Sequence, residues 1–313
     1  MPSRGSKRVI YAAIVANLAI AGSKYLAAIF TQSSAMMAEA VHSTVDIGNE
    51  LLLLLGMKRS NRPADSLHPY GYGKALYFYS LLVAVYIFAL GGGLTVYRGI
   101  SHIRNPVLPE NVRWNYVVLA AAAAFEFYSW RISYHELKSR KDPDESVFDE
   151  IVGSKDPTIF TVFLEDSAGL VGTVLAFLGI FLGVTFHNAY LDPIASILIG
   201  ILLAAVAVLL GRETGALLIG ERTNRARIHK IREIIREDPA VERVGEILTM
   251  QLGPRQVLLT ARIKFRRPLR LQHLESTIER IKSTISAKDP MIERMFVEPD
   301  SLAALTSGEE DAA

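Results

Sequence analysis

The stretch AMMAEAVHSTVDIGNELLLLLG, residues 35–56, decides the fold of this chain. Its second half is as apolar as a membrane-spanning helix. Its first half carries five polar or ionisable residues: Glu39, His42, Asp46, Asn49 and Glu50. At about 100° per residue, all five side chains fall within one arc of about 100° on a helix. An ionisable side chain at the centre of a span costs about 2.5–3.5 kcal/mol, so this stripe indicates a functional face turned toward protein, a cavity or a metal ion.

The composition agrees with insertion into a membrane. Half of the 313 residues are hydrophobic, and the mean hydropathy is +0.25. The chain has no cysteine, which excludes a disulfide framework and a thiolate metal site. A formal net charge of only +2 gives no reason to expect nucleic-acid binding.

Runs long enough to cross a hydrocarbon layer of about 30 Å predict six membrane spans. They cover residues 9–30, 35–56, 75–97, 114–130, 157–186 and 189–211. Six spans place both termini on one side of the membrane. The tail and connections on that side carry twelve Lys and Arg residues, against three on the other side. The positive-inside rule therefore predicts cytoplasmic termini.

After about Arg212 the sequence becomes charged and has the short periodicities of a soluble domain. Isoleucines at 228–235 and apolar residues at 271–285 recur at helical spacing, and residues 257–265 alternate as in a half-buried strand. With further strands at 241–251 and 291–297, the order is α-β-β-α-β. The prediction is thus an all-α six-helix transmembrane bundle over residues 1–212, a small cytoplasmic α+β domain over 213–300, and a disordered acidic tail over 301–313.

The fifth span supplies acidic residues that complement the stripe in residues 35–56. Glu165 and Asp166 are adjacent, and glycines nearby allow another helix to approach. A neutral imidazole with two or three carboxylates is a suitable shell for Zn²⁺ or a similar divalent cation. Because such ligands release protons when they bind metal, the same site suits proton-coupled exchange.

Other polar residues in the spans have structural explanations. Lys24 is expected to snorkel or to pair with a carboxylate, and Glu126 to be the partner of such a lysine or a proton relay. Glu39 is expected to reach the interface or to bond a neighbour. Asp192, placed just before a proline at a helix start, is expected to act as an N-cap.

Three motifs together resemble the cation diffusion facilitator family. They are HSTVD in the second span, the acidic pair in EDSAGLVG of the fifth, and HPYGYGKAL (residues 68–76), which is similar to that family's cytoplasmic HxxGxGK signature. Each motif is short and weak alone. Their order, with six spans and a small cytoplasmic domain, is specific, and the resemblance covers roughly residues 8–300.

The resemblance implies a transport site with two ligands from the second span and two from the fifth, spaced i and i+4. His42 and Asp46 match the first pair and Asp166 matches the second member of the other. Its first member is Val162, which cannot coordinate metal. EDSAGLVG resembles a branch in which the Glu-Asp pair is usual, so Glu165 is predicted to participate. The predicted metal residues are therefore His42, Asp46, Asp166 and Glu165.

A second family site lies in the loop between the second and third spans and uses a carboxylate and two histidines. Asp65 and His68 match it, but Tyr72 stands in place of the second histidine. A structural role for this loop is therefore expected. In the C-terminal domain only His229 and His273 could bind a regulatory metal, and dimerisation is the expected task of that domain.

The resemblance further implies a homodimeric carrier in the lipid bilayer that exports divalent cations in exchange for protons by alternating access. Zn²⁺ is the expected substrate, with Mn²⁺, Fe²⁺, Co²⁺ or Cd²⁺ as other candidates, and no cofactor is expected. One alternative is a membrane-embedded hydrolase using His42, Asp46 and Asp166 around an activated water, although no HExxH or GxSxG motif occurs in a span. Another is a metal-sensing scaffold. The absence of an amphipathic presequence predicts a prokaryotic plasma membrane.

Overall fold

The computed structural model describes residues 4–140, 155–266 and 270–300. The chain divides into two compact units. The first comprises Met1–Arg59 and Leu76–Gly215, and the second comprises Ser60–Ala75 and the part that begins at Ala216. The tail expected at 301–313 lies outside the described residues.

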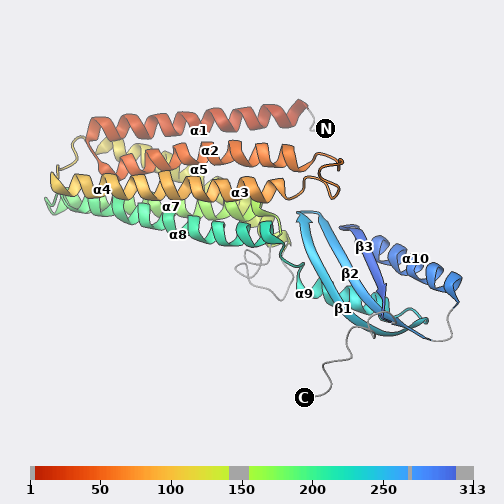
Figure 1. The fold of residues 1–313 in the computed structure, drawn as a ribbon. Coiled ribbons are helices and arrows are strands. Elements are labelled where there is room, and N and C mark those ends of the chain that lie inside the picture. The colour runs from red at the N-terminus through yellow and green to blue at the C-terminus, as the bar shows by residue number, and fades with distance from the viewer. Residues whose placement is uncertain (1–3, 141–154, 267–269, 301–313) are drawn as a thin grey trace, which may run out of the picture. The chain divides into compact units, whose positions relative to one another are not determined.

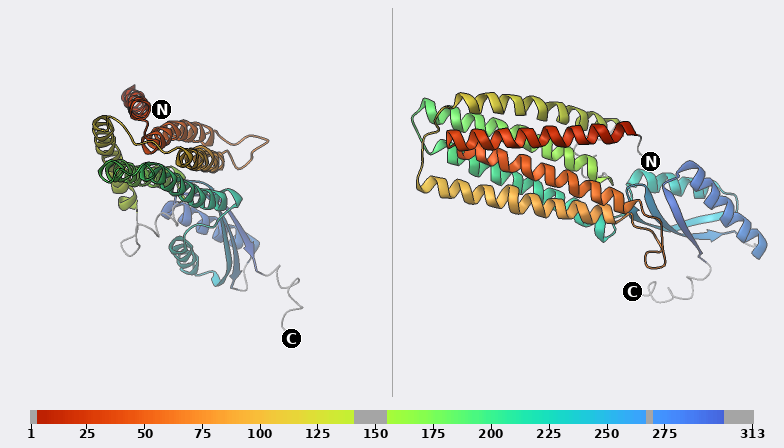
Figure 2. Two further views of the ribbon diagram at one scale, coloured as in Figure 1. Left: turned by 90° about the vertical axis from the view of Figure 1, so that its left-hand side faces the viewer. Right: turned by 90° about the horizontal axis from the view of Figure 1, so that it is seen from above.

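The first unit consists of long helices that run side by side (Figure 1; Figure 2). They are α1 (Arg4–Thr31), α2 (Ser34–Ser60), α3 (Ala75–Tyr86) continued by η1 (Ile87–Leu94) and α4 (Thr95–Arg104), α5 (Arg113–Arg140), α7 (Pro157–Thr185) and α8 (Leu191–Ile219). Among the described residues, three helical stretches are long and apolar enough to cross a membrane: Ala75–Arg104, Phe160–Thr185 and Leu191–Ile219.

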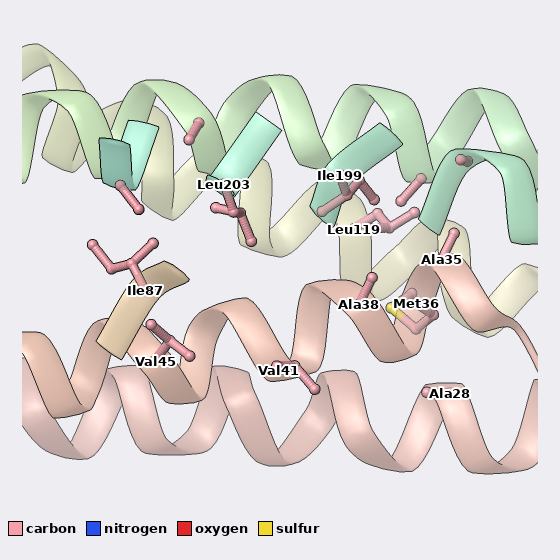
Figure 3. Close-up of a cluster of buried hydrophobic side chains, with 14 of the residues drawn as sticks. Ala28, Ala35, Met36, Ala38, Val41, Val45, Ile87, Leu119, Ile199 and Leu203 are labelled. Carbon is pink, nitrogen blue, oxygen red and sulfur yellow. The ribbon is translucent and has the colours of Figure 1, made fainter. Parts of the chain in front are cut away.

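The core of this unit mixes large side chains with alanines. Figure 3 shows Met36 and Val41 of α2 in one buried cluster with Ile87, Leu119 and Ile199 from other helices. The alanines of α1 and α2 in this cluster allow close backbone approach, the usual way in which helices pack in a membrane.

The start of α2 is fixed by a residue far away in the sequence. The Asp192 side chain is fully buried, and its carboxylate accepts hydrogen bonds from the Ser33 hydroxyl (2.6 Å) and the Ser34 amide (2.6 Å). The Ser33 hydroxyl in turn accepts from the Met36 amide over 3.1 Å. Asp192 therefore satisfies the free amides at the start of α2, and not those of its own helix as the sequence suggested.

The third long helix is irregular at its centre. The expected uniform span contains the π-helical segment η1, which includes three consecutive glycines, Gly91 to Gly93. A Cβ on Gly92 would lie 2.9 Å from the Cβ of Ala204, so the two helices meet here almost backbone to backbone. Glycines both permit this contact and weaken the regular helical pattern.

The second unit contains a three-stranded sheet covered by two helices. The elements are α9 (Arg225–Arg236), β1 (Val241–Gly253), β2 (Gln256–Phe265), α10 (Leu271–Lys288) and β3 (Ile292–Pro299). β2 is the central strand and pairs antiparallel with β1 and parallel with β3. The predicted alternation in β2 is confirmed, because Val257, Leu259 and Ile263 are buried against isoleucines of α9 and α10.

The loop between α2 and α3 packs on this sheet unit. A Cβ on Gly73 would collide with the Leu252 carbonyl and lie 3.0 Å from the Cα of Gly253, at the end of β1. The Lys74 ammonium lies 3.4 Å from the carbonyl oxygen of Leu218. The second glycine of the HPYGYGK motif is thus required for a close backbone contact.

Candidate metal site

The polar stripe of α2 faces the interior of the helical unit. Glu39 and Asn49 are fully buried and His42 is 3% exposed, whereas Asp46 and Glu50 are half-buried. The prediction of one inward polar face is therefore confirmed, with Asp46 and Glu50 less deeply buried than the other three residues of the stripe.

His42 and Asp46 face each other across one helical turn. The Nδ1 atom of His42 lies 3.4 Å from Oδ1 of Asp46. Both atoms are buried, and neither has a hydrogen-bond partner. Buried polar atoms without partners are rare in proteins, and where they occur they can mark the place of a bound ion. A nitrogen and a carboxylate oxygen are also donors that Zn²⁺ and similar divalent cations accept.

The acidic pair on α7 is divided between two neighbouring helices. Glu165 turns toward α2, where its Oε1 accepts a hydrogen bond from Asn49 Nδ2 over 2.7 Å. Asp166 turns toward α5, where its Oδ2 accepts from the hydroxyls of Ser129 (2.9 Å) and Ser133 (3.2 Å). Adjacent helical residues differ by about 100° in direction, which explains the division.

Gly169 brings α7 close to His42. A Cβ at Gly169 would lie 3.0 Å from Nε2 of His42. Since Glu165 lies one helical turn before Gly169, both His42 and Glu165 belong to the contact between α2 and α7. In the described part of the chain, no group of three His, Asp or Glu side chains is close enough to hold a metal ion. The four predicted residues thus occupy neighbouring helices without forming a closed shell.

Sequence reasoning missed the serines of α5. Ser129 and Ser133 are spaced i, i+4, and both donate their hydroxyl hydrogen to the same oxygen of Asp166. Two hydroxyls spaced i, i+4 at the end of the fourth predicted span are a signal that could have identified them. Val162 is half-buried and offers no ligand atom.

The loop motif forms a hydrogen-bonded turn. The Tyr72 hydroxyl donates to Asp65 Oδ2 over 2.6 Å, and the His68 amide donates to Asp65 Oδ1 over 2.7 Å. The hydrogen bond from Tyr72 is the main cause that lowers the pKa of Asp65 below its usual range. Tyr72 thus gives Asp65 a hydrogen-bond donor where a second histidine would have supplied a metal ligand. The histidines of the C-terminal helices lie on exposed faces, with His229 Nε2 3.1 Å from Glu233 of the same helix.

A second polar cluster lies beside the candidate metal site. Lys24 Nζ is 2.9 Å from Glu39 Oε2 and 2.9 Å from Glu126 Oε1. The Thr173 hydroxyl lies 3.1 Å from Glu39 Oε2 and 3.0 Å from Glu126 Oε2. The expectations that Lys24 pairs with a carboxylate and that Glu126 is its partner agree with this arrangement.

The fold is that of a membrane protein, because its helices are long and apolar. The polar stripe of α2, with the facing atoms His42 Nδ1 and Asp46 Oδ1, gives it a buried face suited to a cation. Residues 10–219 match the family model of the cation efflux transmembrane domain. The chain belongs to the cation efflux family, as the motifs predicted. The assignment to a Glu-Asp branch stays a prediction.

Curated relatives of this chain include one named for zinc and one named for manganese. The chain is 30% identical over 293 residues to the proton-coupled zinc antiporter SLC30A9, mitochondrial, of Xenopus laevis, which covers 91% of this chain and 52% of that protein. It is 31% identical to metal tolerance protein C4 of Arabidopsis thaliana, over 83% of this chain and 57% of that protein. The manganese efflux system protein MneP of Bacillus subtilis is 21% identical over 93% of this chain and 95% of its own length. The chain spans about half the length of the first two relatives.

Proposed function

We propose that this chain moves a divalent metal cation across a membrane in exchange for protons. The observation that carries the proposal is that two buried atoms of α2 without hydrogen-bond partners, His42 Nδ1 and Asp46 Oδ1, face each other over 3.4 Å. Glu165 and Asp166 on α7 would complete the ligand set. Because these side chains come from two helices, a small change in helix packing can assemble or open the site, as alternating access requires.

Zn²⁺ is the proposed substrate. One imidazole with carboxylates satisfies the tetrahedral nitrogen and oxygen preferences of Zn²⁺, and relatives are named as zinc antiporters. The same donors also accept Mn²⁺, Fe²⁺, Co²⁺ or Cd²⁺, and MneP is named for manganese. The cation is cargo, and no resident cofactor is proposed.

The proposed assembly is a six-span homodimer held together by the α+β unit, with both termini in the cytoplasm. The charge distribution of the connections supports this orientation. The animal antiporters among the relatives do not support the expected prokaryotic plasma membrane, because they are named as mitochondrial. A membrane hydrolase is not favoured, since the family is one of transporters and not of enzymes.

The test is transport by the purified protein in proteoliposomes loaded with a metal-sensitive dye. Zn²⁺, Mn²⁺, Fe²⁺, Co²⁺ and Cd²⁺ are supplied outside, with and without an inside-acid pH gradient. The proposal predicts uptake of Zn²⁺ that the gradient accelerates. No transport of any of the five ions would overturn it.

A further inference from the structure

The cluster formed by Lys24, Glu39, Glu126 and Thr173 is a buried group with an unbalanced charge. Four helices contribute to it, namely α1, α2, α5 and α7. Lys24 and Glu39 are fully buried, and the Glu126 side chain is 15% exposed. One ammonium group faces two carboxylates, so the fully ionised cluster carries a charge of −1. A buried charge that is not compensated is strongly unfavourable, and the cluster therefore requires one more positive charge.

An unpartnered atom shows where that charge can be held. Oε2 of Glu39 is bonded to Lys24 and Thr173, whereas Oε1 of the same carboxylate is buried and has no partner. A Cβ on residue 172 would lie 2.6 Å from this oxygen, so the glycine at that position leaves it only a narrow space. A proton on this carboxylate makes the cluster neutral.

The cluster is adjacent to the candidate metal site but distinct from it. Its hydrogen bonds join Lys24, Glu39, Glu126 and Thr173 to one another, and in the described part of the chain none reaches the proposed metal ligands. The two sites border the same space beside Gly169, because a Cβ there would be 3.0 Å from His42 Nε2 and 3.3 Å from Glu126 Oε2.

The charged groups of the cluster and of the candidate metal site can interact electrostatically. Lys24 faces the carboxylates from α1. His42 and Asp46 lie one to two turns beyond Glu39 on α2, and Glu165 and Asp166 precede Gly169 on α7. A divalent cation held by these residues would repel a proton from the cluster, because charges interact strongly where water is excluded. Binding of metal and loss of the proton would then favour each other, and this linkage is reciprocal.

We propose that the Lys24–Glu39–Glu126–Thr173 cluster is a proton-binding site, separate from the metal ligands, whose proton is exchanged for the transported cation. The inference rests on the proposed function. A carboxylate takes up one proton from one side of the membrane to become a carboxylic acid, and releases the same proton to the other side. Only an O–H bond forms and breaks. Thr173 holds the two carboxylates together, and Lys24 supplies the permanent positive charge.

The experiment compares Glu126→Gln and Glu39→Gln with the wild-type protein in proteoliposomes. Each substitution leaves Lys24 paired with one remaining carboxylate, a neutral pair, so the cluster no longer needs the proton. Two rates are measured: Zn²⁺ uptake driven by a pH gradient, and exchange of Zn²⁺ for Zn²⁺ without a gradient. We expect the stimulation of Zn²⁺ uptake by the pH gradient to be at least tenfold smaller in both variants. Both variants should retain Zn²⁺/Zn²⁺ exchange. Glu110→Gln, at an exposed position, is the matched control and should keep both.

The outcomes separate this inference from the proposed function. If the pH gradient does not drive wild-type transport, the proposed proton coupling is wrong and the inference falls with it. If the gradient drives transport by the wild type and by both variants equally, the inference alone is overturned.

A second measurement uses only the wild-type protein and therefore does not depend on whether the variants fold. Infrared difference spectra of the wild type should lose a protonated-carboxyl band when Zn²⁺ is added. A spectrum without that loss overturns the inference.

Discussion

Asn49 Nδ2 donates a hydrogen bond to Glu165 Oε1 over 2.7 Å and so joins α2 to α7 inside the helical unit. Both residues are buried, and Oδ1 of Asn49 has no partner. The amide therefore fixes the direction of the α7 carboxylate that faces the polar stripe. Asn49 is a positioning residue for the proposed metal site.

Asn49→Leu should weaken metal binding without removing a ligand. Loss of a group that orients a metal ligand typically costs about 10–100-fold in affinity. We expect the Zn²⁺ concentration for half-maximal transport to rise by that factor, while the maximal rate falls less. Thr44→Val on an exposed position of α2 is the control. An unchanged half-maximal concentration in Asn49→Leu would show that the hydrogen bond does not orient Glu165.

Lys24→Met should destabilise the helical unit. The substitution leaves the carboxyl groups of Glu39 and Glu126 without their cation, and breaking a buried ion pair in this way costs about 3–5 kcal/mol. The thermal unfolding midpoint in detergent should therefore fall. The triple variant with Glu39→Gln and Glu126→Gln should recover much of the loss, because it removes the unpaired charges. A triple variant no more stable than Lys24→Met would contradict this account of the cluster.

Asp192→Ala should destabilise the start of α2. Its carboxylate accepts hydrogen bonds from the Ser33 hydroxyl and the Ser34 amide, and loss of such a cap costs about 0.5–2 kcal/mol. Hydrogen exchange of the first turn of α2 should accelerate. Asp192→Asn keeps an acceptor oxygen and should have a smaller effect. Equal protection in wild type and Asp192→Ala would show that the cap contributes nothing.

Much of this fold could be predicted from local sequence patterns. The apolar runs give the long helices, and the alternation at Val257, Leu259 and Ile263 gives the central strand. The stripe on α2 was visible because one helix carries all its members. The pairing of Lys24 with Glu126 was predictable too, since a buried ammonium group requires a carboxylate.

The remaining features depend on contacts between distant residues, which one sequence does not reveal. Asp192 caps a helix that begins 158 residues earlier, and no local pattern records this partnership. The separation of Glu165 toward α2 and Asp166 toward α5 depends on which helices lie on either side of α7. The packing of Gly73 on the end of β1 likewise depends on tertiary structure.

The order of the hydrogen-bonded turn around Asp65, in the loop between α2 and α3, should depend on pH, and Tyr72 controls this dependence. Hydrogen bonding lowers the pKa of Asp65 in the folded protein. The ionised Asp65 carboxylate therefore contributes fully to the order of the loop at pH values above the pKa of Asp in the unfolded chain, about 3.9. That contribution is lost as the pH falls through the lower folded value. Tyr72→Phe removes the largest cause and should raise the pKa of Asp65, as measured by carbon NMR of its carboxyl group. The same pKa in both proteins would show that the hydroxyl is not bonded in solution.

The most direct test of the proposed function is the initial rate of Zn²⁺ uptake by proteoliposomes that contain Asp46→Ala, measured beside the wild type. Asp46 Oδ1 faces His42 Nδ1, and neither buried atom has a hydrogen-bond partner, so removal of Asp46 leaves His42 without its carboxylate neighbour. Glu279→Ala removes a carboxylate from an exposed position of α10 and serves as the matched control. The account predicts loss of uptake in Asp46→Ala and wild-type uptake in Glu279→Ala. Wild-type uptake by correctly folded Asp46→Ala would contradict it.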